Sequence, residues 1–313
     1  MRLLCAGEAF EDLVFVGLDR LPGPGEEVKT DRFVATIGGG AVITAVHAAR
    51  IGRAPTATAK AVALHRRGLS VELISALGPS AIARLKRERV RVHNLLRPGE
   101  PHAISAAMST TDERSFVTFN GVNAKLEARL ARVMTALASS KPAPMRPTHV
   151  HLCFYPHDCL QWARIVATLR VRGITTSWDF GWNEPLTNDR GLLNLIDELD
   201  FVFVNELEAR LYAGAGKPDG GGRPLGLPAA LDHWRARKAI VIVKLGENGS
   251  LWLAPGRDVH APAPRVKVVD TTGAGDAFNA GFLHAWMNGR TPAQCLALGN
   301  KIGAQSTRRA GGI

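Results

Sequence analysis

Short apolar runs alternate with helical patterns along most of the chain. The runs that predict strands buried on both faces are residues 3–6, 71–77, 150–155, 201–204 and 240–245. Between them, apolar residues at helical spacing predict helices over residues 41–51, 80–89, 160–172, 206–213 and 229–237. Continuous apolar strands are typical of parallel sheets that helices cover on both faces. The pattern therefore predicts an α/β fold with a doubly wound, mostly parallel sheet.

Two segments, residues 12–36 and 93–119, break this rhythm. Each contains alternating or β-branched stretches, such as DLVFVGL and RSFVTF, between Pro and Gly turns. Alternation with a period of two is typical of strands with one solvated face. These segments therefore predict short antiparallel strands in place of strand–helix units.

The stretch DTTGAGDAFNAGF, residues 270–282, places a carboxylate at the start of a helix. Gly273 and Gly275 allow a tight turn, and the helical pattern begins at Ala274. Unpaired N–H groups and the positive end of the helix dipole make such a turn a site for phosphate. Asp276 lies one turn inside, where it could take a proton from a hydroxyl that attacks a phosphoryl group. Taken alone, the stretch is equally compatible with an ordinary capped loop.

Four motifs together resemble the ribokinase-like carbohydrate kinases, the phosphofructokinase-B family. They are the Gly-rich helix start at 270–282, the early segment VATIGGGAVITAVHAARIG at 34–52, the Asn205/Glu208 pair, and IVIVKLGENGSLW at 240–252. All four occur in the family's order. The resemblance implies a single ribokinase-like domain over residues 1–313, in which the segments at about 12–36 and 93–119 form a small lid sheet.

The resemblance implies an ATP-dependent kinase that transfers the γ-phosphoryl group to a primary hydroxyl of a sugar or sugar-like substrate, with Mg²⁺. Carried over position by position, the expected catalytic residues are Gly273, Ala274, Gly275 and Asp276, and the expected substrate-binding residues are Asp12, Gly38, Gly39, Gly40 and Ile43. The expected nucleotide-binding residues are Lys244, Gly246, Gly249, Thr272 and Asn300, and Asn205 and Glu208 would organise Mg²⁺ through water.

Two of these assignments have a structural alternative. The Asp12 carboxylate can accept two hydroxyl hydrogen bonds at once, which suits a sugar diol, but an Asp at this place can also form a turn. Asn205 and Glu208 lie three residues apart and face the same way on a first helical turn. That spacing also matches a capping box, in which the two side chains bond the helix start. The resemblance favours the magnesium site.

The sequence departs from the family in three places. Ile43 stands where an Asn commonly contacts sugar hydroxyls, and residues 77–81, LGPSA, replace an acidic Gly-Asp element. Family members usually continue beyond RRAGG and use that tail to build a monovalent-cation site near Asp270 and Thr272. The sequence therefore leaves open whether this chain has such a site. Ile43, with Phe116 and Phe119, could face a nucleobase. A nucleoside kinase and a non-catalytic sugar-binding homologue are therefore the alternative functions.

The net charge of +11 favours an anionic partner, either a nucleic acid or a nucleotide. The densest basic run, residues 83–92, has an apolar side and predicts the solvated face of a helix. No nucleic-acid motif accompanies it, so we expect a small-molecule substrate and no nucleic acid. There is no run of 18 apolar residues and no signal peptide, which predicts a cytoplasmic protein without a membrane partner. The sequence leaves open whether two copies form a homodimer through their lid strands.

The segment THVHLCFYPHDC, residues 148–159, could bind a metal ion. His149, His151 and Cys153 would share one face of a strand. Structural zinc sites usually have tighter paired spacing, so we expect hydrogen-bonded imidazoles at a strand end.

Overall fold

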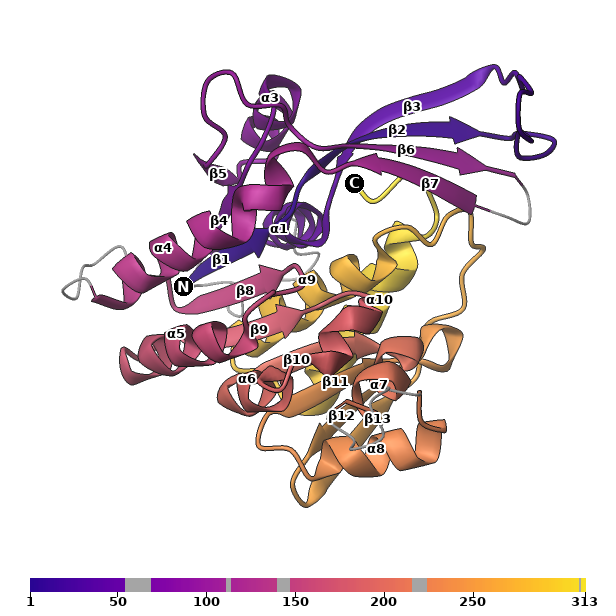
Figure 1. The fold of residues 1–313 in the computed structure, drawn as a ribbon. Coiled ribbons are helices and arrows are strands. Elements are labelled where there is room, and N and C mark those ends of the chain that lie inside the picture. Colours follow the sequence, from indigo (N-terminus) through magenta and orange to yellow (C-terminus); the bar gives the residue numbers. More distant parts are fainter. Residues whose placement is uncertain (54–68, 111–113, 140–146, 216–223, 310) are drawn as a thin grey trace.

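The computed structural model describes residues 1–53, 69–110, 114–139, 147–215, 224–309 and 311–313. Within these residues the largest element is a nine-stranded sheet (Figure 1). Its order is β13 (Arg257–Ala261), β12 (Ser250–Ala254), β11 (Ile240–Lys244), β10 (Phe201–Asn205), β9 (Thr175–Asp179), β8 (His149–Cys153), β1 (Arg2–Gly7), β4 (Ser70–Ser75) and β5 (Arg91–Asn94). Neighbours from β11 to β5 are parallel, and β12 and β13 add an antiparallel edge. The predicted doubly wound, mostly parallel sheet is confirmed.

Each of the five apolar runs predicted as strands lies in the sheet, as β1, β4, β8, β10 and β11. The apolar pattern does not predict β9, whose sequence TTSWD begins with three polar residues. Thr176, Ser177 and Trp178 are nevertheless buried. Hydrogen bonds to neighbouring strands and side chains allow such polar residues to lie inside a sheet.

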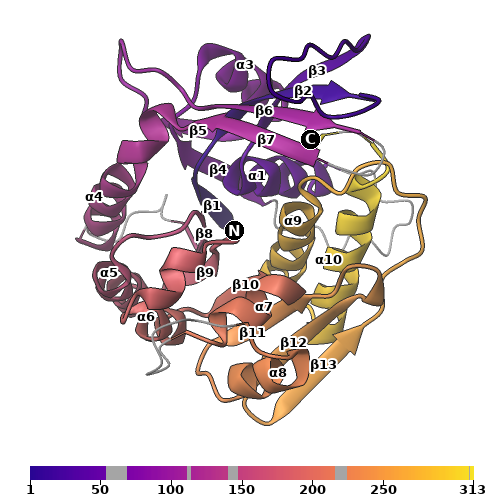
Figure 2. The same ribbon diagram turned by 45° about the vertical axis from the view of Figure 1, so that its right-hand side comes forward.

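Helices cover both faces of the large sheet (Figure 2). One layer contains α1 (Gly40–Ile51), α3 (Pro79–Arg87), α9 (Ala274–Met287) and α10 (Pro292–Ser306). The other contains α4 (Leu126–Ser139), α5 (Cys159–Val171), α6 (Leu192–Glu198), α7 (Glu206–Tyr212) and α8 (Leu227–Arg235). The 3₁₀ turns are Gly121–Lys125, Glu184–Asn188 and Gly246–Asn248. None of the helices in the described ranges combines the length and apolarity that a membrane crossing needs.

A separate four-stranded sheet projects from the large one (Figure 1). Its order is β3 (Arg32–Gly38), β2 (Phe10–Val16), β6 (Ile104–Ser109) and β7 (Arg114–Phe119). The predicted antiparallel pairing is correct for β2–β3 and β6–β7, but wrong for the central pair, because β2 and β6 are parallel. Both strands leave the large sheet in the same direction, Glu11 opposite Ile104, and this shared origin sets their orientation.

The core on the α4–α6 side of the sheet contains a cluster of aromatic rings. Trp178 is fully buried, and its ring lies 4.9 Å from that of Phe154 and 5.2 Å from that of Trp162. The indole Nε1 of Trp178 donates a hydrogen bond of 2.7 Å to the carbonyl of Phe154. The ring therefore joins β9 to the chain that leaves β8, close to the carboxyl edge of the sheet.

We expect Trp178→Ala to lower the free energy of unfolding by about 3–5 kcal/mol, the usual cost of deleting a buried aromatic side chain. The matched control is Trp182→Ala, because Trp182 is 49% exposed and its loss is expected to cost below about 0.5 kcal/mol. Urea denaturation measures both. Equal losses in the two variants would contradict this description of the core.

Candidate active site

A buried ion pair joins the ends of two strands of the large sheet. Lys244, the last residue of β11, donates from Nζ to Oδ2 of Asp179, the last residue of β9, at 2.7 Å. Asn279 of α9 donates to the same oxygen at 2.8 Å. The pair lies at the carboxyl edge of the parallel strands, where ligands bind in open α/β sheets.

The first turn of α9 lies directly over this ion pair. Gly273 is the N-cap and adopts a left-handed conformation with φ 71°, which favours glycine. A Cβ atom on Gly275 would lie 3.1 Å from Lys244 Nζ, so the helix start and the ammonium group are in contact. The free N–H groups of α9 and this ammonium group together favour an anion at the turn.

Lys244 supplies one positive charge to three nearby carboxyl groups, those of Asp179, Glu208 and Asp276. Burial raises the pKa of Asp276 to about 7; Asp179 and Glu208 also raise it, and Lys244 lowers it. Burial and Asp179 likewise raise the pKa of Glu208 to about 7. Burial opposes the charge of Lys244, but Asp179 and Glu208 overcome this and raise the pKa of Lys244. Asp276 is therefore a carboxyl group that can take or release a proton near neutral pH.

Two carboxylates meet the Gly38–Gly40 segment at its two ends. A Cβ atom on Gly38 would lie 2.0 Å from Oδ2 of Asp12, and one on Gly40 would lie 2.9 Å from Oδ1 of Asp276. Burial raises the pKa of Asp12 to about 6. The structure therefore brings Asp12, the glycines and Asp276 together, as the sequence predicts, and leaves the backbone between the two carboxylates without side chains.

Asn205 and Glu208 form a complete capping box at the start of α7. The Glu208 N–H donates to Asn205 Oδ1 and the Asn205 N–H donates to Glu208 Oε2, each at 2.8 Å. The structural alternative is thus present. The described residues contain no group of three or more His, Cys, Asp or Glu arranged to hold a metal ion. The role of this pair toward Mg²⁺ stays a prediction.

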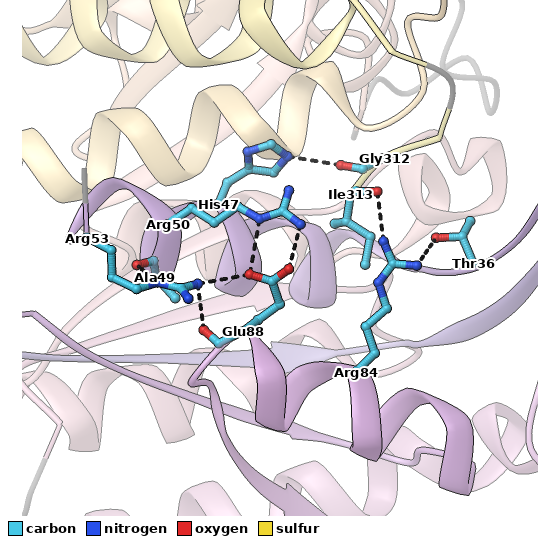
Figure 3. Close-up of polar contacts among 9 residues, drawn as sticks. All are labelled: Thr36, His47, Ala49, Arg50, Arg53, Arg84, Glu88, Gly312 and Ile313. Atoms are coloured by element: carbon cyan, nitrogen blue, oxygen red, sulfur yellow. Dashed lines mark hydrogen bonds and ion pairs between the residues drawn. The ribbon is translucent and has the colours of Figure 1, made fainter. Parts of the chain in front are cut away.

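Ile43 packs beneath the last residues of the chain. It is 4% exposed, and Cβ atoms on Gly273 and Gly312 would lie within 2.8 Å of its Cδ1 atom. The His47 imidazole donates to the Gly312 carbonyl at 2.9 Å, and Arg84 donates to the Ile313 carbonyl at 3.1 Å (Figure 3). The predicted role of Ile43 in substrate choice remains untested, and its observed contacts support the Gly273 turn.

Asp270 and Thr272, near the family's monovalent-cation site, bond to each other and to the end of the chain. Thr272 donates from its N–H and its hydroxyl to Asp270 Oδ1, at 2.9 and 2.7 Å. The Gly311 N–H donates to the other carboxylate oxygen of Asp270 at 2.8 Å. These contacts fix the segment that precedes α9.

A cleft of about 660 Å³ runs from the start of α9 to α10. Of the predicted nucleotide-binding residues, Lys244, Gly246, Gly249 and Asn300 line it, whereas Thr272 does not and its neighbour Thr271 does. Ala274 and Gly275 also line the cleft. Sequence reasoning missed the rest of the wall, which consists of Glu247, Ala263, Pro264, Arg265, Val266, Val268, Phe278, Gly303, Ala304 and Thr307.

Asp179 and Asn279 are the partners of Lys244 that sequence reasoning missed. Asp179 closes the unpredicted strand β9, so no apolar run pointed to it. The signal was the position of an Asp directly after the β-forming stretch TTSW, at the carboxyl end of a strand.

The histidines of β8 are hydrogen-bonded within the sheet. His149 pairs with the Thr175 and Ser177 hydroxyls at 2.9 and 2.7 Å, and His151 Nδ1 contacts the same Ser177 hydroxyl at 2.7 Å. These contacts confirm the expectation of bonded imidazoles, although His151 Nε2 has no partner among the described residues.

The strand pairing in the small sheet places Phe116 on the Asp12 face and Phe119 on the opposite face.

The fructoselysine 6-kinase of Escherichia coli (strain K12) is 38% identical over 151 residues. The match covers 44% of this chain and 47% of that enzyme, so the chain spans less than half the length of this curated relative.

Two solved structures share the fold over nearly the whole chain. The ribokinase of Thermotoga maritima has a TM-score of 0.73 and 21% identity, covering 100% of this chain and 94% of that one. The nucleoside kinase of Methanocaldococcus jannaschii has a TM-score of 0.72 and 20% identity, covering 99% and 92%. A family model described as pfkB family carbohydrate kinase matches residues 2–313. This protein therefore belongs to the pfkB family of carbohydrate kinases.

Proposed function

We propose that this protein is an ATP-dependent kinase that transfers the γ-phosphoryl group of ATP to a primary hydroxyl of a sugar or sugar-like substrate. The observation that carries the proposal is Asp276, a carboxyl group with a pKa raised to about 7 by burial, in contact with Gly40 and on the first turn of α9. A base with a pKa near the working pH combines the right protonation state with the strongest driving force for proton transfer.

The acceptor would bind along the Gly38–Gly40 segment. Asp12 would accept hydrogen bonds from two sugar hydroxyls at one end, and Asp276 would accept the proton of the attacking hydroxyl at the other. The N–H groups of Gly273, Ala274 and Gly275, at the start of α9, would stabilise the charge on the transferring group. Gly39 and Ile43 would shape the space between these groups.

The nucleotide would lie in the cleft beside Lys244, Gly246, Gly249 and Asn300, with Thr271 in the place predicted for Thr272. Asn300 donates from Nδ2 to the Ala261 carbonyl at 2.9 Å, which would fix that end of the cleft for the base. The polyphosphate would then reach the Lys244 ammonium group and the start of α9, where the helix dipole favours an anion. The net charge of +11 supports an anionic ligand of this kind.

Asn205 and Glu208 would hold Mg²⁺ through water molecules. The chemistry of this pair fits the ion, because the Asn205 amide and the Glu208 carboxylate carry oxygen atoms and Mg²⁺ prefers oxygen ligands shared with phosphates. When bound, Mg²⁺ supplies charge neutralisation of the phosphates. The capping box fixes one Glu208 oxygen and thereby orients the carboxylate.

The small sheet would act as a lid over the acceptor. Its inner face carries Asp12, and the opposite face carries exposed Phe33, Val117 and Phe119, which are 53%, 65% and 54% exposed. Phe15 packs against Phe33 on that outer face at 5.3 Å between ring centroids. An exposed apolar patch of this kind marks an interaction site, and we propose that a second copy of this chain covers it.

Substrate is expected to slow hydrogen exchange in β3 and β6, because closure of the lid would protect their backbone amides. Exchange would be measured with and without saturating acceptor and ATP, with the buried strand β10 as the control that does not change. If the outer faces of two copies pair, raising the protein concentration without substrate should also slow hydrogen exchange in β7. Unchanged exchange in β3 and β6 at saturation would count against a lid.

Asp276→Asn is expected to lower kcat by roughly 10²–10⁴, the usual worth of a positioned proton acceptor. The change keeps the side-chain shape, so nucleotide binding should persist, and stability should change by at most ~1 kcal/mol. A coupled ADP-release assay over pentoses, hexoses, keto-deoxy acids and nucleosides first identifies the best acceptor. The matched control is Asp232→Asn, which alters an exposed carboxylate on α8. Near-native turnover by Asp276→Asn would refute the mechanism.

The pH dependence of kcat/KM should show a limb near pH 7, with activity rising as Asp276 loses its proton. Asp179→Asn removes a charge that raises the pKa of Asp276, so the limb should move to lower pH. Lys244→Gln removes a charge that lowers that pKa, so the limb should move to higher pH. The position of the limb is the measurement, since the two variants also change the rate itself. Shifts in the same direction would contradict the assignment.

A further inference from the structure

A second cavity, of about 160 Å³, lies beside the proposed acceptor site and plays no part in the chemistry described above. Its polar lining includes Glu8, Asn123, Glu127, Tyr155 and His157. Glu8 directly follows β1, and Tyr155 and His157 follow β8. In the sheet, β4 lies on one side of β1 and β8 lies on the other. The strand order therefore reverses between β1 and β8. Ligands of open α/β sheets bind at this switch point.

The Gly38–Gly40 segment connects this cavity to Asp276. A Cβ atom on Gly39 would lie 2.2 Å from the backbone oxygen of Glu8, and one on Gly40 would lie 2.9 Å from Asp276 Oδ1. Neighbouring Cα atoms are about 3.8 Å apart. The cavity and the proposed base therefore lie on either side of one dipeptide, and a substrate whose hydroxyl reaches Asp276 extends its other end toward Glu8.

The cavity presents hydrogen-bond acceptors that lack donors. Asn123 is 6% exposed, and its Nδ2 donates to the Ala9 carbonyl at 3.2 Å, which fixes the orientation of the amide. Its Oδ1 is buried and has no donor among the described residues. The Glu8 carboxylate likewise receives no hydrogen bond from the described part of the chain. A buried acceptor without a partner is costly, so the Asn123 oxygen favours a ligand that donates a hydrogen bond. The half-buried Glu8 carboxylate, in the same cavity lining, can accept another.

The charge of the cavity is negative. Glu127 is held in place by the Trp162 indole and the His157 backbone N–H, each at 2.9 Å, and by the His157 ring at 2.6 Å. Within the described residues, no lysine or arginine lines the cavity. Burial raises the pKa of Glu8 to about 7, although His157 lowers it. A cation beside Glu8 would restore its charged form.

We infer that this cavity binds a protonated amine on the non-reacting end of the acceptor, so that the preferred substrate is an amine-bearing sugar or polyol. The inference rests on the proposed function for the position of the reacting hydroxyl. The ammonium group supplies three donors and a positive charge, which match the Glu8 carboxylate and the free Asn123 oxygen. A neutral hydroxyl in the same place would leave Glu8 without a counter-charge.

Matched acceptor pairs test this inference: 2-amino-2-deoxyhexoses against hexoses, and 1-amino-1-deoxyhexitols against hexitols. Isothermal titration calorimetry without nucleotide measures binding, and ADP release measures turnover. We expect the better amine to bind at least about 10-fold more tightly than its hydroxyl partner, the usual ratio for a hydrogen bond to a charged group. Glu8→Gln should bring that ratio close to one, whereas the control Glu198→Gln, at a surface ion pair with Arg170, should leave it unchanged.

Equal binding of amine and hydroxyl partners by the wild-type protein would overturn the inference, whether or not Glu8→Gln folds. A preference that survives in a folded Glu8→Gln variant, checked by its melting temperature, would also overturn it. Preferential binding of amines without ADP release from any acceptor would support the cavity and refute the proposed kinase activity. The two proposals therefore fail on different measurements.

Discussion

The ion pair between Lys244 and Asp179 holds the site together, because it joins the ends of β9 and β11 and receives Asn279 from α9. A buried ion pair contributes little net stability, but removing one partner is costly because the other charge is left unpaired. Here Lys244 also faces Glu208 and Asp276, so one cation serves three carboxylates. The remaining negative charge raises the pKa values of Glu208 and Asp276 to about 7. In the proposed mechanism, this residual charge would allow Asp276 to accept a proton at neutral pH.

Besides the Lys244–Asp179 ion pair, the site requires a backbone segment that comes close to two carboxylates. The Gly38–Gly40 segment contacts Asp12 at one end and Asp276 at the other, so a side chain at Gly38 or Gly40 would crowd one of these carboxylates. A side chain at Gly39 would overlap the Glu8 backbone oxygen. The segment also leads from β3 of the small sheet into α1. If the small sheet acts as the proposed lid, movement of β3 would shift this segment, which contacts both Asp276 and the Glu8 backbone.

The sequence predicted the parts of the fold that depend on local patterns and missed those that depend on distant partners. β1, β4, β8, β10 and β11 were predicted because strands buried on both faces are continuously apolar. β9 was missed, since its polar residues Thr175 and Ser177 find their hydrogen-bond partners in His149 and His151 of the neighbouring strand. The parallel β2–β6 pairing depends on where two distant strands leave the large sheet. Motif order pointed to Asp276, whereas Asp179 and Glu8 belong to no recognised motif.

A carbon-13 NMR titration of the side-chain carboxyl of Asp276 tests the central claim most directly. Comparison with the Asp276→Asn spectrum assigns the signal in the free enzyme. If the buried cluster around Lys244 tunes this carboxyl group as a base, its midpoint lies near pH 7. A midpoint close to 4, the ordinary value for an aspartate, would show that the cluster does not perturb Asp276 and would contradict the account.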